Sequence, residues 1–154
     1  MKILNVCAGD NIVEGAMNTD VARLKGITCF WNVNDESGME NNTFDLIIMR
    51  YAVNYVQPVN FINFMKEIYR IAKPNAIIKI TASTQNSKKS MVSQPFKLHT
   101  NDIENYFVDR IDNKGGWYNT NWEIKVKFEI LKKRWNNILQ RWATEVYYEL
   151  KVIK

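Results

Sequence analysis

The sequence has few cysteines, prolines and glycines, and a single histidine. Its 154 residues include two Cys, three Pro and six Gly. Two cysteines are too few for a disulfide framework and lack the spacing of a zinc site, so we expect reduced thiols and no metal. No apolar run approaches the roughly 18 residues of a membrane-spanning helix, and the first residues lack a signal-type cleavage pattern. We therefore expect a soluble, cytoplasmic protein without a membrane span.

The composition is that of one globular domain. Hydrophobic residues make up 46% of the chain and charged residues 24%, which is enough apolar material for a core. Residues 1–83 hold as many basic as acidic side chains, so the net charge of +5 lies entirely in residues 84–154. A basic half can attract nucleic acid, but a lysine-rich solvated surface is the plainer interpretation.

The first half of the chain alternates apolar strand patterns with one helical pattern. Apolar and β-branched runs predict strands over residues 2–8, 17–21, 27–33, 44–49 and 76–82. Apolar residues at helical spacing predict a helix over residues 59–72, which Lys73, Pro74 and Asn75 end. Strands that alternate with helical segments indicate a parallel sheet covered on both faces, which is an α/β fold.

The second half has a different pattern. Residues 83–94 are polar and predict a surface loop, and residues 101–107 predict a short helix. Residues 122–135 and 142–153 alternate and are rich in aromatic and β-branched residues, which is typical of two antiparallel strands. We expect this hairpin to close the sheet at the end of the chain.

Four stretches resemble, in order, the successive motifs of class I S-adenosylmethionine-dependent methyltransferases. They are ILNVCAGDN, EGAMNTDV, FDLIIMRYAVNYV and EIYRIAKPNAIIKIT, and together they cover residues 3–83. The resemblance is greatest to small members whose chain passes from the first strand to the second with almost no helix. It implies a Rossmann-like, mostly parallel sheet of about seven strands with a C-terminal antiparallel hairpin. It also implies S-adenosyl-L-methionine as the cofactor, bound in residues 1–83, with residues 84–154 on the substrate side.

The predicted cofactor residues follow the ends of the strands, where open parallel sheets bind their ligands. Gly9 would let the backbone approach the ligand, and Asp20 would accept hydrogen bonds from both ribose hydroxyls. Asn34 or Asp35 would contact the adenine amine, and the sequence does not choose between them. A turn glycine and a surface acid are the alternative interpretations. With the flanking residues, the resemblance assigns the cofactor to Cys7, Ala8, Gly9, Asp10, Asp20, Asn34, Asp35, Met49 and Arg50.

Two residues depart from the pattern of the family. Cys7 replaces the first glycine of the usual Gly-x-Gly, and Asn5 stands where an acidic residue often precedes it. Gly9 is followed by Asp10 and Asn11, so the loop does not have the Gly-x-Gly-x-x-Gly of a nicotinamide enzyme either. The departures raise a second hypothesis, which is a degenerate, non-catalytic module of methyltransferase-like fold.

The acceptor side of the reaction has no obvious catalytic cluster. Methyl transfer needs two reactants held in line more than it needs reactive side chains. In the resembling fold the segment after residue 49 faces the methyl group, so Arg50 would hold an acidic group of the acceptor. Tyr51 and His99 are the candidate catalytic residues, although packing for the former and an ordinary surface position for the latter are the plainer interpretations. The acceptor and the oligomeric state stay unpredicted.

Aromatic and basic residues occur together in the second half. Trp117, Trp122, Trp135 and Trp142 lie near several Lys and Arg residues in the sequence. Such a surface could stack bases and neutralise phosphates, so the non-catalytic module would bind nucleic acid or a protein partner through it. Tryptophans packed in the core beside solvated lysines are the favoured interpretation of the same alternation.

Overall fold

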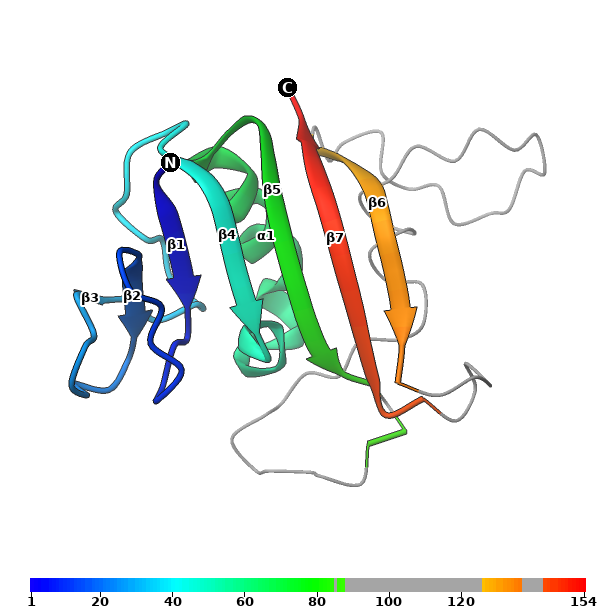
Figure 1. The fold of residues 1–154 in the computed structure, drawn as a ribbon, viewed down its shortest axis with the longest axis horizontal. Coiled ribbons are helices and arrows are strands. Elements are labelled where there is room, and N and C mark those ends of the chain that lie inside the picture. The colour runs from blue at the N-terminus through cyan, green and yellow to red at the C-terminus, as the bar shows by residue number, and fades with distance from the viewer. Residues whose placement is uncertain (85, 88–125, 137–142) are drawn as a thin grey trace.

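The computed structural model describes residues 1–84, 86–87, 126–136 and 143–154. In these segments seven strands form one sheet in the order β3-β2-β1-β4-β5-β7-β6 (Figure 1). The strands β1 to β5 run parallel, and β7 runs antiparallel to both β5 and β6. Their bounds are β1 Ile3–Val6, β2 Met17–Asp20, β3 Cys29–Phe30, β4 Phe44–Arg50, β5 Ala72–Ser83, β6 Lys127–Trp135 and β7 Glu145–Ile153. The predicted Rossmann-like fold with a C-terminal antiparallel pair is therefore confirmed.

One α-helix, α1 (Phe61–Ile71), follows the 3₁₀ turns η1 (Ala52–Tyr55) and η2 (Pro58–Asn60). It lies behind the sheet in the view of Figure 1. Its buried residues recur every three or four positions, as an amphipathic helix requires, and they are Phe61, Phe64, Met65, Ile68 and Ile71. They pack in one core with alternate residues of the sheet, among them Ile47 and Met49 of β4. The prediction of a helix here is confirmed, with its ends one or two residues inside the expected ones.

On β4 and β5, the opposite face of the sheet carries side chains that are partly buried or exposed. Leu46, Ile48 and Ile77 lie on this face, between the buried residues of their strands. Residues 7–16 and 21–28, which connect the first three strands, contain no helix. Among the described residues α1 is the only α-helix, so the expected helical cover of both faces is found on one face. None of the described helices is long and apolar enough to span a membrane.

In the described residues every predicted strand differs in length from the observed one, as β1 does, which covers only Ile3–Val6 of the expected residues 2–8. The strand expected over residues 27–33 consists only of β3, an edge strand that pairs with β2 alone. Trp31 and Val33 lie beyond it but are buried, because the chain turns inward and stacks Trp31 on Phe64. The strand expected over residues 76–82 begins directly after α1, at Ala72. Of the strand expected over residues 142–153, the described part begins at Glu145.

Several predictions fall on residues that the structure does not describe. They are the greater part of the loop over residues 83–94, the short helix over residues 101–107, and the positions of His99, Trp117, Trp122 and Trp142. Trp135 is described, and it is partly buried against the core.

Candidate functional site

A pocket opens at the carboxyl ends of the parallel strands. Its volume is about 480 Å³, within the range of small-molecule sites. The lining residues come from the ends of β1, β2 and β4 and from the segment after β3. They are Cys7, Ala8, Gly9, Asn11, Asp20, Val21, Asn32, Val33, Asn34, Arg50, Tyr51 and Tyr55. This is the edge of the sheet at which the sequence predicted a ligand.

Gly9 and Asp20 are joined directly. The Gly9 N–H donates to Asp20 Oδ2 at 2.9 Å, and the Ala22 N–H donates to Oδ1 at 2.9 Å. Gly9 has a φ of 52°, and a Cβ built there would meet no atom within 4 Å. A carboxylate has about four acceptor positions, so each Asp20 oxygen keeps capacity for one more donor. The two backbone bonds fix the orientation of this carboxylate at the wall of the pocket.

Two buried asparagines, Asn5 and Asn18, hold the loop after β1 through hydrogen bonds. Asn5 Nδ2 donates to the Asn11 carbonyl at 2.8 Å and to Asn18 Oδ1 at 2.8 Å. Asn18 in turn accepts from the Val13 N–H at 2.9 Å and donates to the Val13 carbonyl at 3.0 Å. An acidic residue at position 5 could not donate both hydrogen bonds. Asn5 therefore anchors a helix-free loop through two donated hydrogen bonds that an acidic side chain could not make. The Asn5–Asn18 pair was not predicted from the sequence.

Cys7 lies at the start of the loop in a left-handed conformation with a φ of 50°. Burial, and to a lesser extent the negative charge of Asp20, raise the pKa of its thiol to about 12. The thiol is therefore neutral at physiological pH and is not an activated nucleophile. Cys7 occupies the position where the resembling family has glycine, and its positive φ is the conformation that glycine adopts at no cost.

Arg50 and Tyr51 form the wall of the pocket at the end of β4. Arg50 is exposed and has no ion-pair partner in the described part of the chain. Tyr51 has a φ of 60°, its N–H donates to the Thr81 carbonyl at 2.7 Å, and its Oη donates to Glu145 Oε1 at 2.7 Å. The hydrogen bond to the Glu145 carboxylate, together with partial burial, raises the pKa of Tyr51 to about 12.

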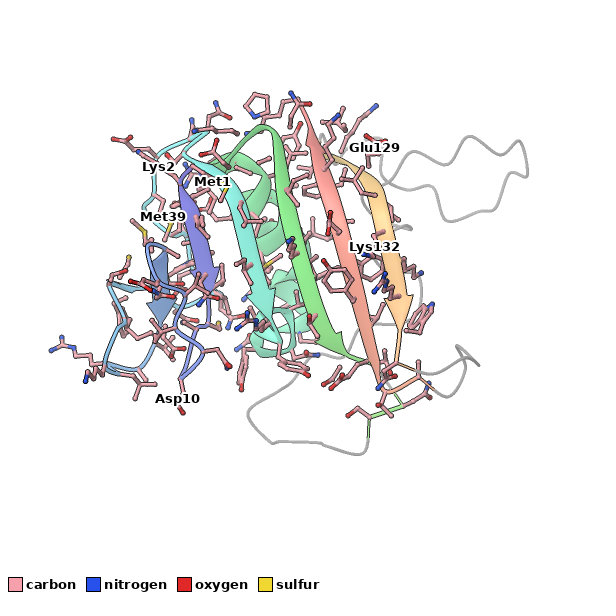
Figure 2. All side chains as sticks on the ribbon, viewed as in Figure 1. Met1, Lys2, Asp10, Met39, Glu129 and Lys132 are labelled. Atoms are coloured by element: carbon pink, nitrogen blue, oxygen red, sulfur yellow. The ribbon has the colours of Figure 1, made fainter. Side chains whose placement is uncertain are left out.

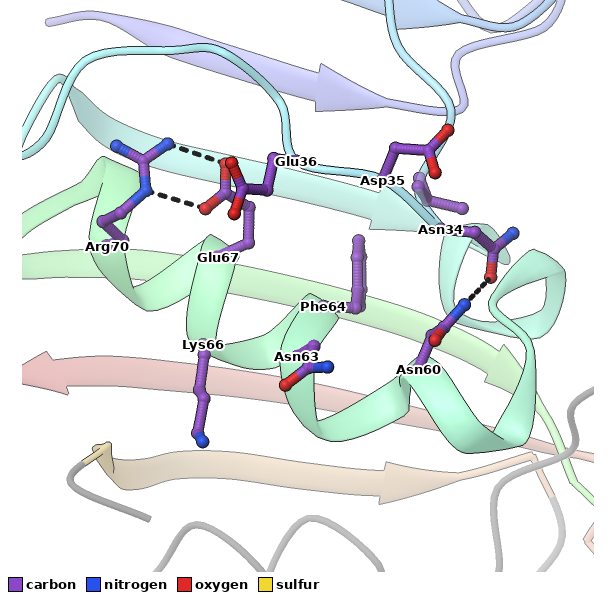
Figure 3. Close-up of a pocket in the computed structure, with 10 residues that line it drawn as sticks. Asn34, Asp35, Glu36, Asn60, Asn63, Phe64, Lys66, Glu67 and Arg70 are labelled. Atoms are coloured by element: carbon purple, nitrogen blue, oxygen red, sulfur yellow. Dashed lines mark hydrogen bonds and ion pairs between the residues drawn. The ribbon is translucent and has the colours of Figure 1, made fainter.

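Asn34 and Asp35 occupy different surroundings. Asn34 Oδ1 accepts from the Gln57 N–H at 2.7 Å, and Nδ2 donates to the Tyr55 carbonyl at 3.2 Å, so this amide holds the segment after η1. Asp35 is exposed and accepts from Asn32 Nδ2 at 2.9 Å. Asp35 lines a second cavity of about 410 Å³ between residues 33–36 and α1, and Asn34 also borders this cavity (Figure 3). Val33 and Asn34 line both cavities.

The structure brings most of the predicted cofactor residues together. Cys7, Ala8, Gly9, Asp20, Asn34, Arg50 and the acceptor-side candidate Tyr51 line the pocket. Met49 is fully buried in the core and Asp35 borders the second cavity. Asp10 does not line the pocket and lies at the outer tip of its loop (Figure 2). His99 lies outside the described residues.

Five lining residues were not named from the sequence. They are Asn11, Val21, Asn32, Val33 and Tyr55. Val21 directly follows the last residue of β2, so its position after a strand end was the available signal. Within the described ranges, no group of three or more His, Cys, Asp or Glu side chains is placed to hold a metal ion.

Comparison with known proteins gives matches in structure only. No protein-family model and no curated protein matches this sequence. An S-adenosylmethionine-dependent methyltransferase from Mesorhizobium loti is 8% identical with a TM-score of 0.63, over 97% of this chain and 90% of that one. The 1,6-didemethyltoxoflavin-N1-methyltransferase of Burkholderia thailandensis, with bound 1,6-didemethyltoxoflavin and S-adenosylhomocysteine, is 9% identical with a TM-score of 0.62, over 99% and 71%.

A third similar structure has a different activity in its name. It is the [4+2]-cyclase SpnF, which is 11% identical with a TM-score of 0.64, over 99% of this chain and 74% of that one. A shared fold at such identities does not fix the reaction. The chain has the fold of S-adenosylmethionine-dependent methyltransferases.

Proposed function

We propose that this protein binds S-adenosylmethionine in the pocket beside Gly9 and Asp20 and transfers its methyl group to an acceptor that enters beside Tyr51. The observation that carries the proposal is the Asp20 carboxylate, which two backbone N–H groups hold at the end of β2. It lines a pocket large enough for a nucleoside ligand and keeps acceptor capacity for two more hydrogen bonds.

The residues around the pocket fit the parts of this cofactor. Asp20 would accept hydrogen bonds from the ribose hydroxyls, which are donors that a fixed carboxylate binds well. Val21 and Val33 supply apolar side chains for the adenine ring, and Asn32 and Asn34 supply amides. Gly9 leaves space for close approach of the ligand to the backbone, since its Cβ position is open.

When bound, S-adenosylmethionine supplies a methyl group on a positively charged sulfur that leaves as a neutral thioether. The chain's own contribution is to align the acceptor with that methyl group and to exclude water. Arg50 and Tyr51 are the residues at the end of β4 that would do so. The exposed guanidinium of Arg50 would attract an acceptor that carries an acidic group.

Calorimetric titration with S-adenosylhomocysteine tests the proposal. We expect the wild-type protein to bind it, and Asp20→Asn to weaken binding by about 1 to 3 kcal/mol through loss of a charge-assisted contact. Asp10→Asn is the matched control, because Asp10 lies in the loop after β1, next to Gly9, and does not line the pocket. Binding by Asp10→Asn should match the wild type.

The same titration can contradict the proposal in two ways. Failure of the wild type to bind at about 1 mM ligand, a concentration that corresponds to roughly 4 kcal/mol, would reject the cofactor and favour a non-catalytic module. Equal affinity of Asp20→Asn and Asp10→Asn would reject the role of Asp20. Because Asp20 also holds Gly9 and Ala22, circular dichroism must show that Asp20→Asn is folded at the titration temperature.

A further inference from the structure

Two Tyr–Glu hydrogen bonds in the described part of the chain, Tyr51–Glu145 and Tyr147–Glu149, differ in their surroundings. Tyr51 Oη donates to Glu145 Oε1 at 2.7 Å, and Tyr147 Oη donates to Glu149 Oε2 at 2.9 Å. The second pair lies within β7, two residues apart in sequence. The first joins residues 94 positions apart and places a carboxylate next to a side chain that lines the pocket. Only the first pair is in a position to meet a ligand.

Tyr51 is held in this position against its backbone preference. Its φ of 60° and ψ of 3° are in the left-handed region, which a bulky residue rarely adopts. The hydrogen bond from its backbone N–H to the Thr81 carbonyl and the hydrogen bond from its Oη to Glu145 fix both ends of the residue. A strained conformation that its neighbours over-determine is characteristic of functional sites.

The direction of the hydrogen bond limits what Tyr51 can do. Its hydroxyl carries one hydrogen, and that hydrogen is donated to Glu145. The Tyr51 oxygen can therefore only accept from a ligand, so the ligand must present an O–H or N–H group. The raised pKa of Tyr51, about 12, keeps the hydroxyl protonated at neutral pH, so it can pass a proton on but cannot act alone as a base.

We propose that Tyr51 and Glu145 relay the proton of a hydroxyl acceptor during methyl transfer, with Tyr51 in contact with the acceptor and Glu145 as a positioning residue and proton sink. This inference rests on the proposed function. The acceptor oxygen forms a bond to the methyl carbon as the carbon–sulfur bond breaks, and that electron pair stays on sulfur. The acceptor proton moves to Tyr51 Oη while the Tyr51 proton moves to Glu145. Water takes the proton from Glu145 after the product leaves.

The relay suits a hydroxyl and not an aliphatic amine. A methylated hydroxyl that still holds its proton is an oxonium, which is far more acidic than a carboxylic acid, so transfer to Glu145 is downhill. A methylated aliphatic amine has a pKa near that of lysine, about 10, so it is a far weaker acid than a carboxylic acid and would keep its proton. A carboxylate acceptor has no proton to give. The Tyr51–Glu145 pair therefore selects alcohols or phenols.

The test compares the two Tyr–Glu pairs, with phenol and benzylamine as the probes. Tyr51→Phe and Glu145→Gln are set against Tyr147→Phe and Glu149→Gln. Phenol binding is measured by NMR in protein saturated with S-adenosylhomocysteine and labelled with ¹³Cζ-tyrosine. We expect phenol to shift the Tyr51 signal and leave that of Tyr147 in place. We expect the Kd of phenol to rise at least tenfold in Tyr51→Phe and to stay within twofold of the wild-type value in Tyr147→Phe.

Methyl transfer from labelled S-adenosylmethionine gives the second readout. We expect methylation of phenol and not of benzylamine. Glu145→Gln should lower kcat for phenol at least tenfold and leave KM within twofold, whereas Glu149→Gln should change neither. If Glu145 only held Tyr51 in place, Glu145→Gln would raise KM for phenol as well as lower kcat.

Contrary results separate this inference from the proposed function. If wild-type protein fails to bind S-adenosylhomocysteine, the proposed function and the relay both fail. If it binds this ligand but phenol does not bind, or the Tyr51 and Tyr147 variants bind phenol equally, the relay alone is overturned. Methylation of benzylamine at the rate of phenol also overturns it.

Discussion

The two ends of the parallel strands use their polar groups differently. At the amino ends, Asp45 accepts from the Lys2 N–H at 2.6 Å and from Lys73 Nζ at 2.8 Å. There, Lys154 donates to Asn42 and to the Ala72 carbonyl, both at 2.5 Å. At the carboxyl ends, Arg50 and Asp20 line an open pocket instead of pairing with charged neighbours. The charged groups at the amino ends are therefore paired within the protein, whereas Arg50 and Asp20 at the carboxyl ends are available to a ligand.

The backbone shows the same contrast. Non-glycine residues with positive φ occur at both ends, as Asn42 and Asn75 at the amino ends and as Cys7 and Tyr51 at the carboxyl ends. Asparagine tolerates the left-handed conformation, whereas Cys and Tyr pay about 1 to 2 kcal/mol for it. Strain is thus retained where the pocket lies and avoided where the chain only turns. Three predictions break or sharpen this comparison.

The largest effect is expected from the buried amide that holds the carboxyl ends together. Asn54 accepts from the Ser83 N–H at 2.9 Å and donates to the Ser83 carbonyl at 3.1 Å, and it is fully buried. Asn54→Ala leaves two buried backbone groups without these partners, which should cost about 2 to 4 kcal/mol. Urea denaturation measures the loss. Asn63→Ala, on the exposed side of α1, is the control and should stay within about 0.5 kcal/mol.

A result of less than about 1 kcal/mol for Asn54→Ala would break the comparison, because the carboxyl ends would then not depend on buried hydrogen bonds. The strain at Tyr51 would also need another support, since η1 begins directly after it.

A smaller, pH-dependent effect is expected near the amino ends, from Glu67 in the last turns of α1. Its hydrogen bonds with Arg70, at 2.7 Å, and with Ser37 lower the pKa of Glu67 to about 2. A lowered pKa stabilises the folded state above the ordinary value of 4.5, and this stabilisation is lost as the pH falls through about 2. Glu67→Gln should cost about 1 to 2 kcal/mol at pH 7, after allowance for solvent screening by the partly exposed Arg70.

The measurement is the free energy of unfolding of both proteins between pH 7 and pH 2. The two curves should converge as the pH falls, because the wild-type carboxylate becomes protonated. A gap that stays constant with pH would show that Glu67 acts through packing, and the amino ends would then not owe their stability to ion pairs.

Much of the fold follows from local patterns in the sequence. Strands such as β1 and β4 are mostly apolar, and α1 has apolar residues at helical spacing. The edge strand β3 could not be delimited, because its length is set by pairing with β2 and by the burial of Trp31 beyond its end. Tertiary packing decided that boundary, and no local pattern records it.

The site was predictable to the extent that it follows strand ends. Gly9 and Asp20 meet because β1 and β2 are parallel neighbours. Alternation along β4, which can be seen in the sequence, puts Met49 on the buried face with Ile47 and Arg50 on the other face, as the structure has them. Glu145 could not be predicted as a neighbour of Tyr51, because the two residues are 94 positions apart and meet only through the pairing of β5 with β7.

The smallest effect on stability sharpens the comparison most, because it places one alanine at each end of the strands. Gly9 has a φ of 52° and Asn75 a φ of 63°. Gly9→Ala and Asn75→Ala should each cost about 1 kcal/mol, since alanine is strained in the left-handed region. The Cβ at position 9 meets no atom within 4 Å in the protein, so stability alone does not distinguish the two variants.

Titration with S-adenosylhomocysteine should distinguish them, because the Cβ at position 9 projects beside a backbone that lines the pocket. We expect roughly tenfold weaker binding for Gly9→Ala, equivalent to about 1.4 kcal/mol, and unchanged binding for Asn75→Ala. Equal affinities would mean that the open space at Gly9 serves the turn of the chain and not a ligand.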